Sequence, residues 1–225
     1  MGALTVHLKA TYLQLRIYIW MVIIIIILGR LAEFIVGFFT DSSQKTGLAD
    51  GNLLLLILLI IAIVLPLSYY NRIVHLGASR KQYFWGLQFV YIMWAAALAL
   101  FNSLWPILEV NVLHKNTLNL IEAFHWNEFG IMGSFLYQTI FYLMTMALLS
   151  MLISGFYHFF GWFLWVLLIV AIPTGTAIPA LRTHVVSFFE ALLFNDSLLK
   201  GVGFNLVLFF VFVAVGWFFT KKRTH

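Results

Sequence analysis

Long apolar runs separated by short polar breaks dominate the 225-residue chain. A run of about 20 apolar residues crosses a hydrocarbon layer roughly 30 Å thick when it is helical. The runs are continuous, whereas a transmembrane β-barrel shows alternation of apolar and polar positions. The pattern predicts an all-α polytopic membrane protein with six transmembrane helices, at 17–38, 53–70, 84–105, 131–153, 160–179 and 203–220.

The segment before the first span has an apolar stripe of its own. Leu4, Leu8, Tyr12 and Leu15 recur near one helical face. This spacing predicts an amphipathic helix over 1–16 that lies in the membrane interface. The alternative is a simple extension of the first span. The first apolar run is too long for a cleavable signal, so we expect it to stay as an anchor.

The chain after the fifth span is broken but still apolar. Pro173, Gly175 and Pro179 lie in the stretch AIPTGTAIPA, and proline removes a backbone donor and clashes one turn back. The segment 180–201 that follows is too short to span and is predicted to form two short half-inserted helices. We therefore expect a re-entrant helical hairpin on the outer side before the last span. Between spans four and five, the stretch 154–161, SGFYHFFG, predicts a tight interfacial hairpin.

Composition supports the membrane assignment. Hydrophobic residues make up 63% of the chain and charged residues 9%, whereas about a quarter of a soluble domain is charged. This excludes a water-soluble fold. With most residues in the bilayer, one helical domain covering 1–225 is expected, without a separate soluble domain.

The basic residues set the orientation. With the N-terminus inside, eight of the 13 Lys and Arg residues fall in cytoplasmic segments, and all eight acidic residues fall on the outer half. The positive-inside rule therefore places both termini in the cytoplasm. The net charge of +5 then reflects topology and attraction to anionic lipid, and nucleic acid is not expected as a partner.

The loop 70–84 between spans two and three is the most basic polar break within the chain. Ser79 and Gln82 have the spacing of a capping box for the third span, and Gly77 permits a positive φ. Residues 71–76 are predicted to form one or two helical turns that could insert into a partner. On charge alone, an ordinary positive-inside loop is the alternative.

Motifs for catalysis are missing from the sequence. It has no cysteine, which excludes disulfides and thiolate chemistry. Neither a GxxxxGK[ST] phosphate loop nor an HExxH motif occurs. Glu122 and His125 form a single ExxH pair, for which interfacial hydrogen bonding is the better interpretation. We expect no enzymatic activity and no cofactor in this chain.

Polar groups inside the spans are candidates for a substrate path. Arg30 and Glu33 lie three residues apart in the first span, where they could neutralise each other or line a path. Asn102 and Gln138 could contact substrate or could form interhelical hydrogen bonds. The sequence leaves both alternatives open.

Several of these features together resemble a known family. The stretch 76–86, LGASRKQYFWG, joins spans two and three, Gly161 and Trp162 open span five, and a broken apolar hairpin precedes span six. This order is similar to the membrane subunits of ATP-binding-cassette exporters of the type-2 permease family. The small bacterial members encoded apart from their ATPase are the most similar in layout.

The resemblance implies a docking role for the basic loop. In that family the loop is a coupling helix seated in a groove of the cytoplasmic ATPase, so the expected coupling residues are Arg72, Ile73, Leu76, Gly77, Ser79, Arg80, Lys81, Gln82, Tyr83 and Phe84. It also implies two permease subunits, identical or different, and ATP and Mg bound by the partner ATPase. The expected location is a bacterial plasma membrane.

Two classes of function follow. The first is ATP-driven export of an amphipathic or hydrophobic substrate, with peptides, toxins and antibiotics favoured. The second is a non-transporting scaffold, immunity or sensor protein that docks a cytoplasmic partner through the same loop. The sequence does not identify the substrate, and it does not distinguish a homodimer from a heterodimer or export from self-immunity.

Overall fold

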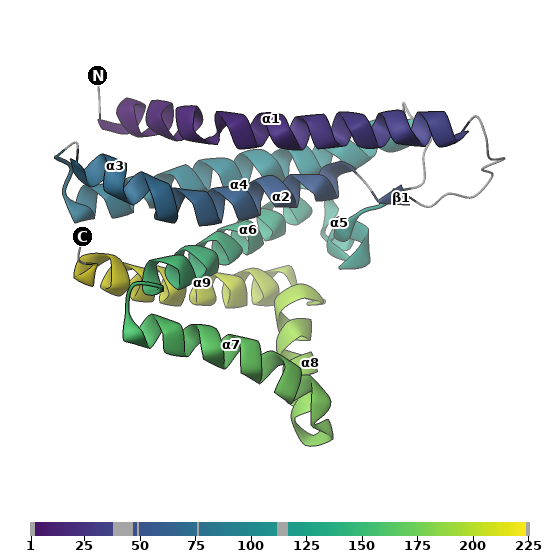
Figure 1. The fold of residues 1–225 in the computed structure, drawn as a ribbon. Helices are drawn as coiled ribbons and strands as arrows, with labels where there is room; N and C mark the ends of the chain where they lie inside the picture. Colours follow the sequence, from purple (N-terminus) through teal and green to yellow (C-terminus); the bar gives the residue numbers. More distant parts are fainter. Residues whose placement is uncertain (1–2, 38–46, 49, 76, 112–116, 224–225) are drawn as a thin grey trace.

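The computed structural model describes residues 3–37, 47–48, 50–75, 77–111 and 117–223. The structure is helical (Figure 1). The elements are α1 Ala3–Gly37, α2 Asp50–Val64, a π-helical segment η1 Leu65–Tyr69, α3 Tyr70–His75, α4 Arg80–Asn111, α5 Leu120–Ala123, a 3-10 turn η2 Trp126–Phe129, α6 Gly130–Gly155, α7 Phe159–Ala177, α8 Pro179–Leu193 and α9 Leu198–Lys222. The dipeptides β1 Gly47–Leu48 and β2 Thr117–Leu118 pair in parallel.

The chain is a helical, multi-pass membrane protein. Within the described ranges, the helices long and apolar enough to cross a membrane are Thr11–Ala32, Arg80–Ile107, Trp126–Gly155, Phe159–Ala177 and Leu198–Lys222. The predicted span 53–70 corresponds to the shorter apolar helix Asn52–Ser68, which is about 25 Å long at 1.5 Å per residue. A sixth crossing by this helix stays a prediction.

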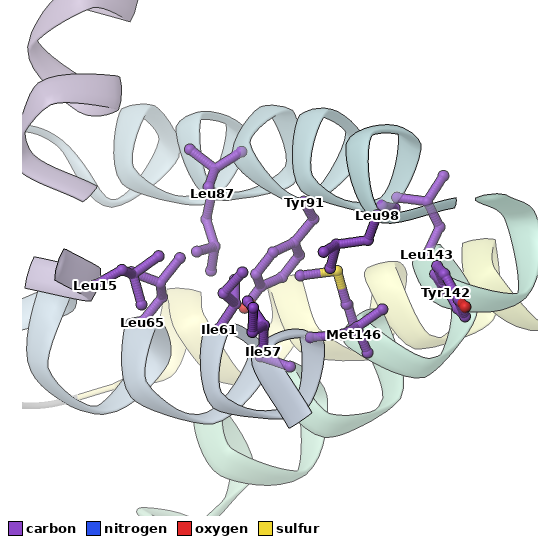
Figure 2. Close-up of a cluster of buried hydrophobic side chains, with 14 of the residues drawn as sticks. Leu15, Ile57, Ile61, Leu65, Leu87, Tyr91, Leu98, Tyr142, Leu143 and Met146 are labelled. Atoms are coloured by element: carbon purple, nitrogen blue, oxygen red, sulfur yellow. The ribbon is translucent and has the colours of Figure 1, made fainter. Parts of the chain in front are cut away.

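Helix α6 lies at the centre of the fold and packs against α2, α4 and α9 (Figure 1). Of the 18 consecutive residues that are most apolar in the span Trp126–Gly155, 56% are buried. In the corresponding stretches of α1 and α7, 11% of the residues are buried. The large core cluster draws mainly on α1, α2, α4 and α6, and Figure 2 shows part of it between these helices. Leu15 comes from α1, Ile61 from α2, Tyr91 from α4 and Met146 from α6, and each is fully buried.

Helix α1 is uninterrupted from Ala3 to Gly37. Over the described residues 3–16 the backbone matches the alternative, an extension of the first span. The location of this part in the membrane interface stays a prediction. The sequence offers no reason to stop, since neither glycine nor proline occurs from residue 3 to residue 28. Two residues of the predicted apolar stripe also lie in different surroundings: Leu15 is buried, whereas Tyr12 is 54% exposed.

The segment between α7 and α9 differs from the prediction. Pro173 lies inside α7, which runs to Ala177, within the predicted fifth span at 160–179. Such prolines are tolerated in membrane helices because nearby groups satisfy the freed backbone. Pro179 occupies the first turn of α8, where its missing N–H costs nothing. Where two short helices were expected over 180–201, the structure has one 15-residue helix and the start of α9.

The tight hairpin expected at 154–161 is confirmed. Helix α6 ends at Gly155 and α7 begins at Phe159. The backbone N–H of His158 donates to the Gly155 carbonyl over 2.9 Å. A Cβ on Gly161 would overlap that carbonyl group, so only glycine allows the two helices to meet this closely.

A matched pair of glycines in α9 tests the packing. A Cβ on Gly201 would overlap the ring of buried Tyr137, whereas a Cβ on Gly203 meets nothing within 4 Å. We expect Gly201→Ala to lower the free energy of unfolding by about 1–3 kcal/mol and Gly203→Ala to leave it within about 0.5 kcal/mol. Denaturation in mixed micelles measures both. Equal stability of the two variants would contradict the packing of α6 against α9.

Candidate functional site

Several functional candidates meet at one end of the bundle. Figure 1 places the start of α1, helix α3, the α6–α7 turn and the C-terminal end of α9 there. Apart from the start of α1, the segments that meet there are 70–86, 154–161 and 217–223, and these three contain six Lys and Arg residues and no acidic residue. This end is therefore strongly basic.

The turn between α3 and α4 is built by local hydrogen bonds. The N–H of Gly77 donates to the Val74 carbonyl over 3.0 Å, and the N–H of Ala78 donates to the Ile73 carbonyl over 3.2 Å. This pair of bonds is a Schellman motif, which needs a left-handed residue. Gly77 supplies it with a φ of +87°, which confirms the predicted positive φ.

Helix α4 begins with the predicted capping box. The N–H of Ser79 donates to Oε1 of Gln82 over 2.9 Å, and the N–H of Gln82 donates to Oγ of Ser79 over 3.2 Å. Two backbone donors that a helix start leaves unpaired are thereby satisfied. The turn is thus fixed on both sides, by the Schellman motif before it and by the capping box after it.

Burial divides the expected coupling residues into two sets. Ile73, Tyr83 and Phe84 are at most 4% exposed, and they pack into the chain's own core. The expectation that Ile73 inserts into a partner is therefore wrong for this conformation. The exposed residues are Gly77, Ser79, Lys81 and Gln82, with Arg80 partly exposed. The side chain of Arg72 and the whole of Leu76 lie outside the described residues.

Aromatic contacts attach the buried set to the rest of the fold. Tyr83 meets the ring of Tyr70 edge-on at 5.1 Å, and Phe84 lies 5.2 Å from the ring of Trp217 in α9. Nη1 of Arg80 donates to the Lys221 carbonyl over 2.6 Å. The turn is consequently bound to the C-terminal end of α9 by both apolar and polar contacts.

Arg223 is a functional candidate that sequence reasoning missed. Its side chain is 3% exposed, and Nη1 donates to the Pro66 carbonyl over 3.0 Å. The guanidinium carbon lies 4.1 Å from the ring centres of both Tyr70 and Tyr157. In the sequence Arg223 counted only as a topology signal, because its partners lie far away along the chain.

The candidate path residues form a network between α4 and α6. Asn102 Nδ2 donates to Gln138 Oε1 over 3.0 Å and to the Tyr142 hydroxyl over 3.2 Å, and Gln138 Nε2 donates to Ser103 Oγ over 3.2 Å. Asn102 and Gln138 are 1% and 0% exposed. Their mutual bonds match the interhelical alternative. Arg30, on α1, is partly exposed, and the side chain of Glu33 lies outside the described residues.

At the opposite end of the bundle, side chains of other segments fix the C-terminal end of α8. The Leu192 carbonyl accepts from the Tyr137 hydroxyl over 3.0 Å and from Asn205 Nδ2 over 3.1 Å, and the Leu193 carbonyl accepts from Trp126 Nε1 over 2.8 Å. Carbonyls at a helix end lack partners inside the helix. Side chains from three other segments supply them here and hold α8 in place.

In the ExxH pair of Glu122 and His125, the imidazole lies beside another carboxylate. His125 Nδ1 instead lies 3.4 Å from Glu128 Oε1, and both side chains are about 70% exposed. In the part of the chain that is described, no three His, Asp or Glu side chains gather in a group that could hold a metal ion.

No protein-family model, curated protein or solved structure matches the chain. Function is therefore inferred from the two ends of the bundle and from the sequence resemblance.

A double-mutant cycle on Asn102→Ala and Gln138→Ala tests the network. We expect a coupling free energy of about 0.6–1.7 kcal/mol in mixed-micelle unfolding, since interhelical hydrogen bonds contribute that much. Ser187→Ala is the control partner, because Ser187 bonds within α8 and distant sites add independently. Additive effects of Asn102→Ala and Gln138→Ala would show that the pair does not join α4 to α6.

Proposed function

We propose that the chain is the membrane subunit of an ATP-driven exporter and that the α3–α4 turn docks a separate cytoplasmic ATPase. One observation carries the proposal. The turn exposes Ser79, Lys81 and Gln82, while its neighbours Ile73, Tyr83 and Phe84 are locked into the core. The resemblance of 76–86 to the coupling loop of type-2 permeases supports the same conclusion.

The rigidity of the turn suits docking. The Schellman bonds and the capping box fix its backbone before any partner binds, so little ordering entropy is lost on association. The exposed residues Ser79, Lys81 and Gln82 form the rim of the turn. Force applied to this rim passes into α4 and α9 through the contact of Phe84 with Trp217 and through the hydrogen bond from Arg80 to the Lys221 carbonyl. Rigid-body movement of packed helices is a common way to transmit such a change.

Charge defines the partner surface. Lys81 is exposed and Arg80 partly so, and no acidic residue occurs in the three segments that meet there. An acidic groove on the ATPase would complement the basic residues Arg80 and Lys81 and speed the association of the two proteins. The phosphate-binding loop missing from this sequence would then belong to the partner, together with ATP and Mg.

Several finer points belong to the same proposal. The docking end faces the cytoplasm, since its three segments hold six of the 13 Lys and Arg residues and no acidic residue. The membrane is a bacterial plasma membrane, and six helices cross it, including Asn52–Ser68. Two permease subunits assemble, and the cargo is an amphipathic or hydrophobic molecule such as a peptide, toxin or antibiotic. These points rest on the family resemblance and on the charge pattern.

Co-purification tests the docking. The chain carries a tag on a flexible C-terminal linker, and its partners are identified after mild extraction from the native membrane. We expect an ATP-binding-cassette ATPase with the parent chain and about tenfold less with Lys81→Glu, which corresponds to 1.4 kcal/mol of binding free energy. Lys200→Glu, an equal charge reversal at the exposed start of α9, is the control and should keep the ATPase.

Two outcomes would contradict the proposal. If the parent chain captures no ATPase in several mild detergents, the exporter has no motor, and the scaffold or immunity function replaces it. If Lys81→Glu captures as much ATPase as the parent chain, the α3–α4 turn is not the docking site.

A further inference from the structure

Arg223 is buried at the docking end and is held by three groups from elsewhere in the fold. These groups are the Pro66 carbonyl, the ring of Tyr70 and the ring of Tyr157. A guanidinium over an aromatic face is attracted by the ring electrons, more strongly when water is excluded. The two rings and the carbonyl together replace the hydration that this charge loses on burial.

The contacts of Arg223 join segments that the sequence separates widely. Pro66 belongs to η1, Tyr70 begins α3, and Tyr157 lies in the α6–α7 turn. An arginine at a helix C-terminus ordinarily interacts with the last carbonyls of its own helix. Nη1 of Arg223 instead bonds the Pro66 carbonyl, 157 positions away in the chain, which ties the end of α9 to η1. The contact with the ring of Tyr70 extends this tie to the start of α3.

Helix α3 has six residues and follows α2 and η1 without a break, so it is the last part of one longer helical run. The burial of Tyr70 and Ile73 and the contact of Tyr70 with Arg223 set where this end of the run lies. Tyr70 links the guanidinium of Arg223 to the ring of Tyr83 in the first turn of α4. A continuous line of contacts therefore runs from the end of α9 through α3 to the exposed rim.

We propose that Arg223 is the positioning residue of the docking turn: it holds α3 and the first turn of α4 in register with α9 and with the α6–α7 turn. This inference rests on the proposed function for its purpose, but its geometry can be tested without any partner. Arg223 does not contact the ATPase in this proposal and acts only through Tyr70 and the turn.

The cysteine-free sequence makes a distance measurement direct. Spin labels are attached at Lys81→Cys and Phe159→Cys, both exposed positions, in purified chain without partner. We expect a narrow distance distribution in the parent and one about twofold broader in Arg223→Met, because the untied α3 and the first turn of α4 then move locally. The width of the distribution in Arg223→Lys should lie between those of the parent and Arg223→Met, since lysine keeps the charge but lacks the planar guanidinium group.

Two further variants separate positioning from general loss of stability. Tyr157→Leu removes one ring and leaves the carbonyl bond, so it should broaden the distribution less than Arg223→Met. Gly201→Ala, which weakens packing at the opposite end, should lower stability without broadening the distribution. If Arg223→Met fails to fold, Arg223→Lys and Tyr157→Leu carry the test.

The outcomes distinguish this inference from the docking proposal. A distribution in Arg223→Met or, failing that, in Tyr157→Leu as narrow as that of the parent overturns the positioning role, whatever the parent chain captures. A broad distribution in Arg223→Met together with a reduced capture of the ATPase that Arg223→Lys partly restores supports it. If the parent chain captures no ATPase, the docking proposal fails, and the distance result still decides whether Arg223 holds the turn.

Discussion

Polar side chains buried on α6 must find their hydrogen-bond partners within the chain, because protein surrounds most of this helix. Gln138 binds Asn102 of α4, Ser134 Oγ donates to the Trp126 carbonyl over 2.6 Å, and the Tyr137 hydroxyl reaches the end of α8. Inside a membrane the hydrophobic effect does not drive helices together, so packing and such bonds decide which helices meet. The bonds of α6 thereby fix the positions of α4, η2 and α8 around it.

Both ends of the bundle use the same physical device. Side chains from distant segments donate hydrogen bonds to carbonyl groups at helix ends. Trp126 and Tyr137 donate to carbonyls of α8 at one end of the bundle, and Arg80 donates to a carbonyl of α9 at the other. A helix end so bound moves with its partners rather than alone. This explains how an exposed turn of a few residues can be stiff enough to pass a partner's movement into the membrane helices, as the proposed coupling requires.

The sequence predicts the local features well and the distant ones poorly. Hydropathy locates the apolar helices, and the Gly77 turn and the Ser79 capping box are found because their partners lie within a few residues. The burial of Ile73 and the contacts of Arg223 depend on segments brought together only by folding, so charge and spacing misjudge both.

The proposed docking requires this end of the bundle to face the cytoplasm, and the absence of cysteine allows its orientation to be measured directly. Single cysteines replace exposed Lys81 at the docking end and exposed Asn127 at the opposite end, and a membrane-impermeant maleimide is applied to cells. If the docking end faces the cytoplasm, Asn127→Cys reacts in intact cells and Lys81→Cys reacts only after permeabilisation. Labelling of Lys81→Cys in intact cells would place the turn outside and contradict docking to a cytoplasmic ATPase.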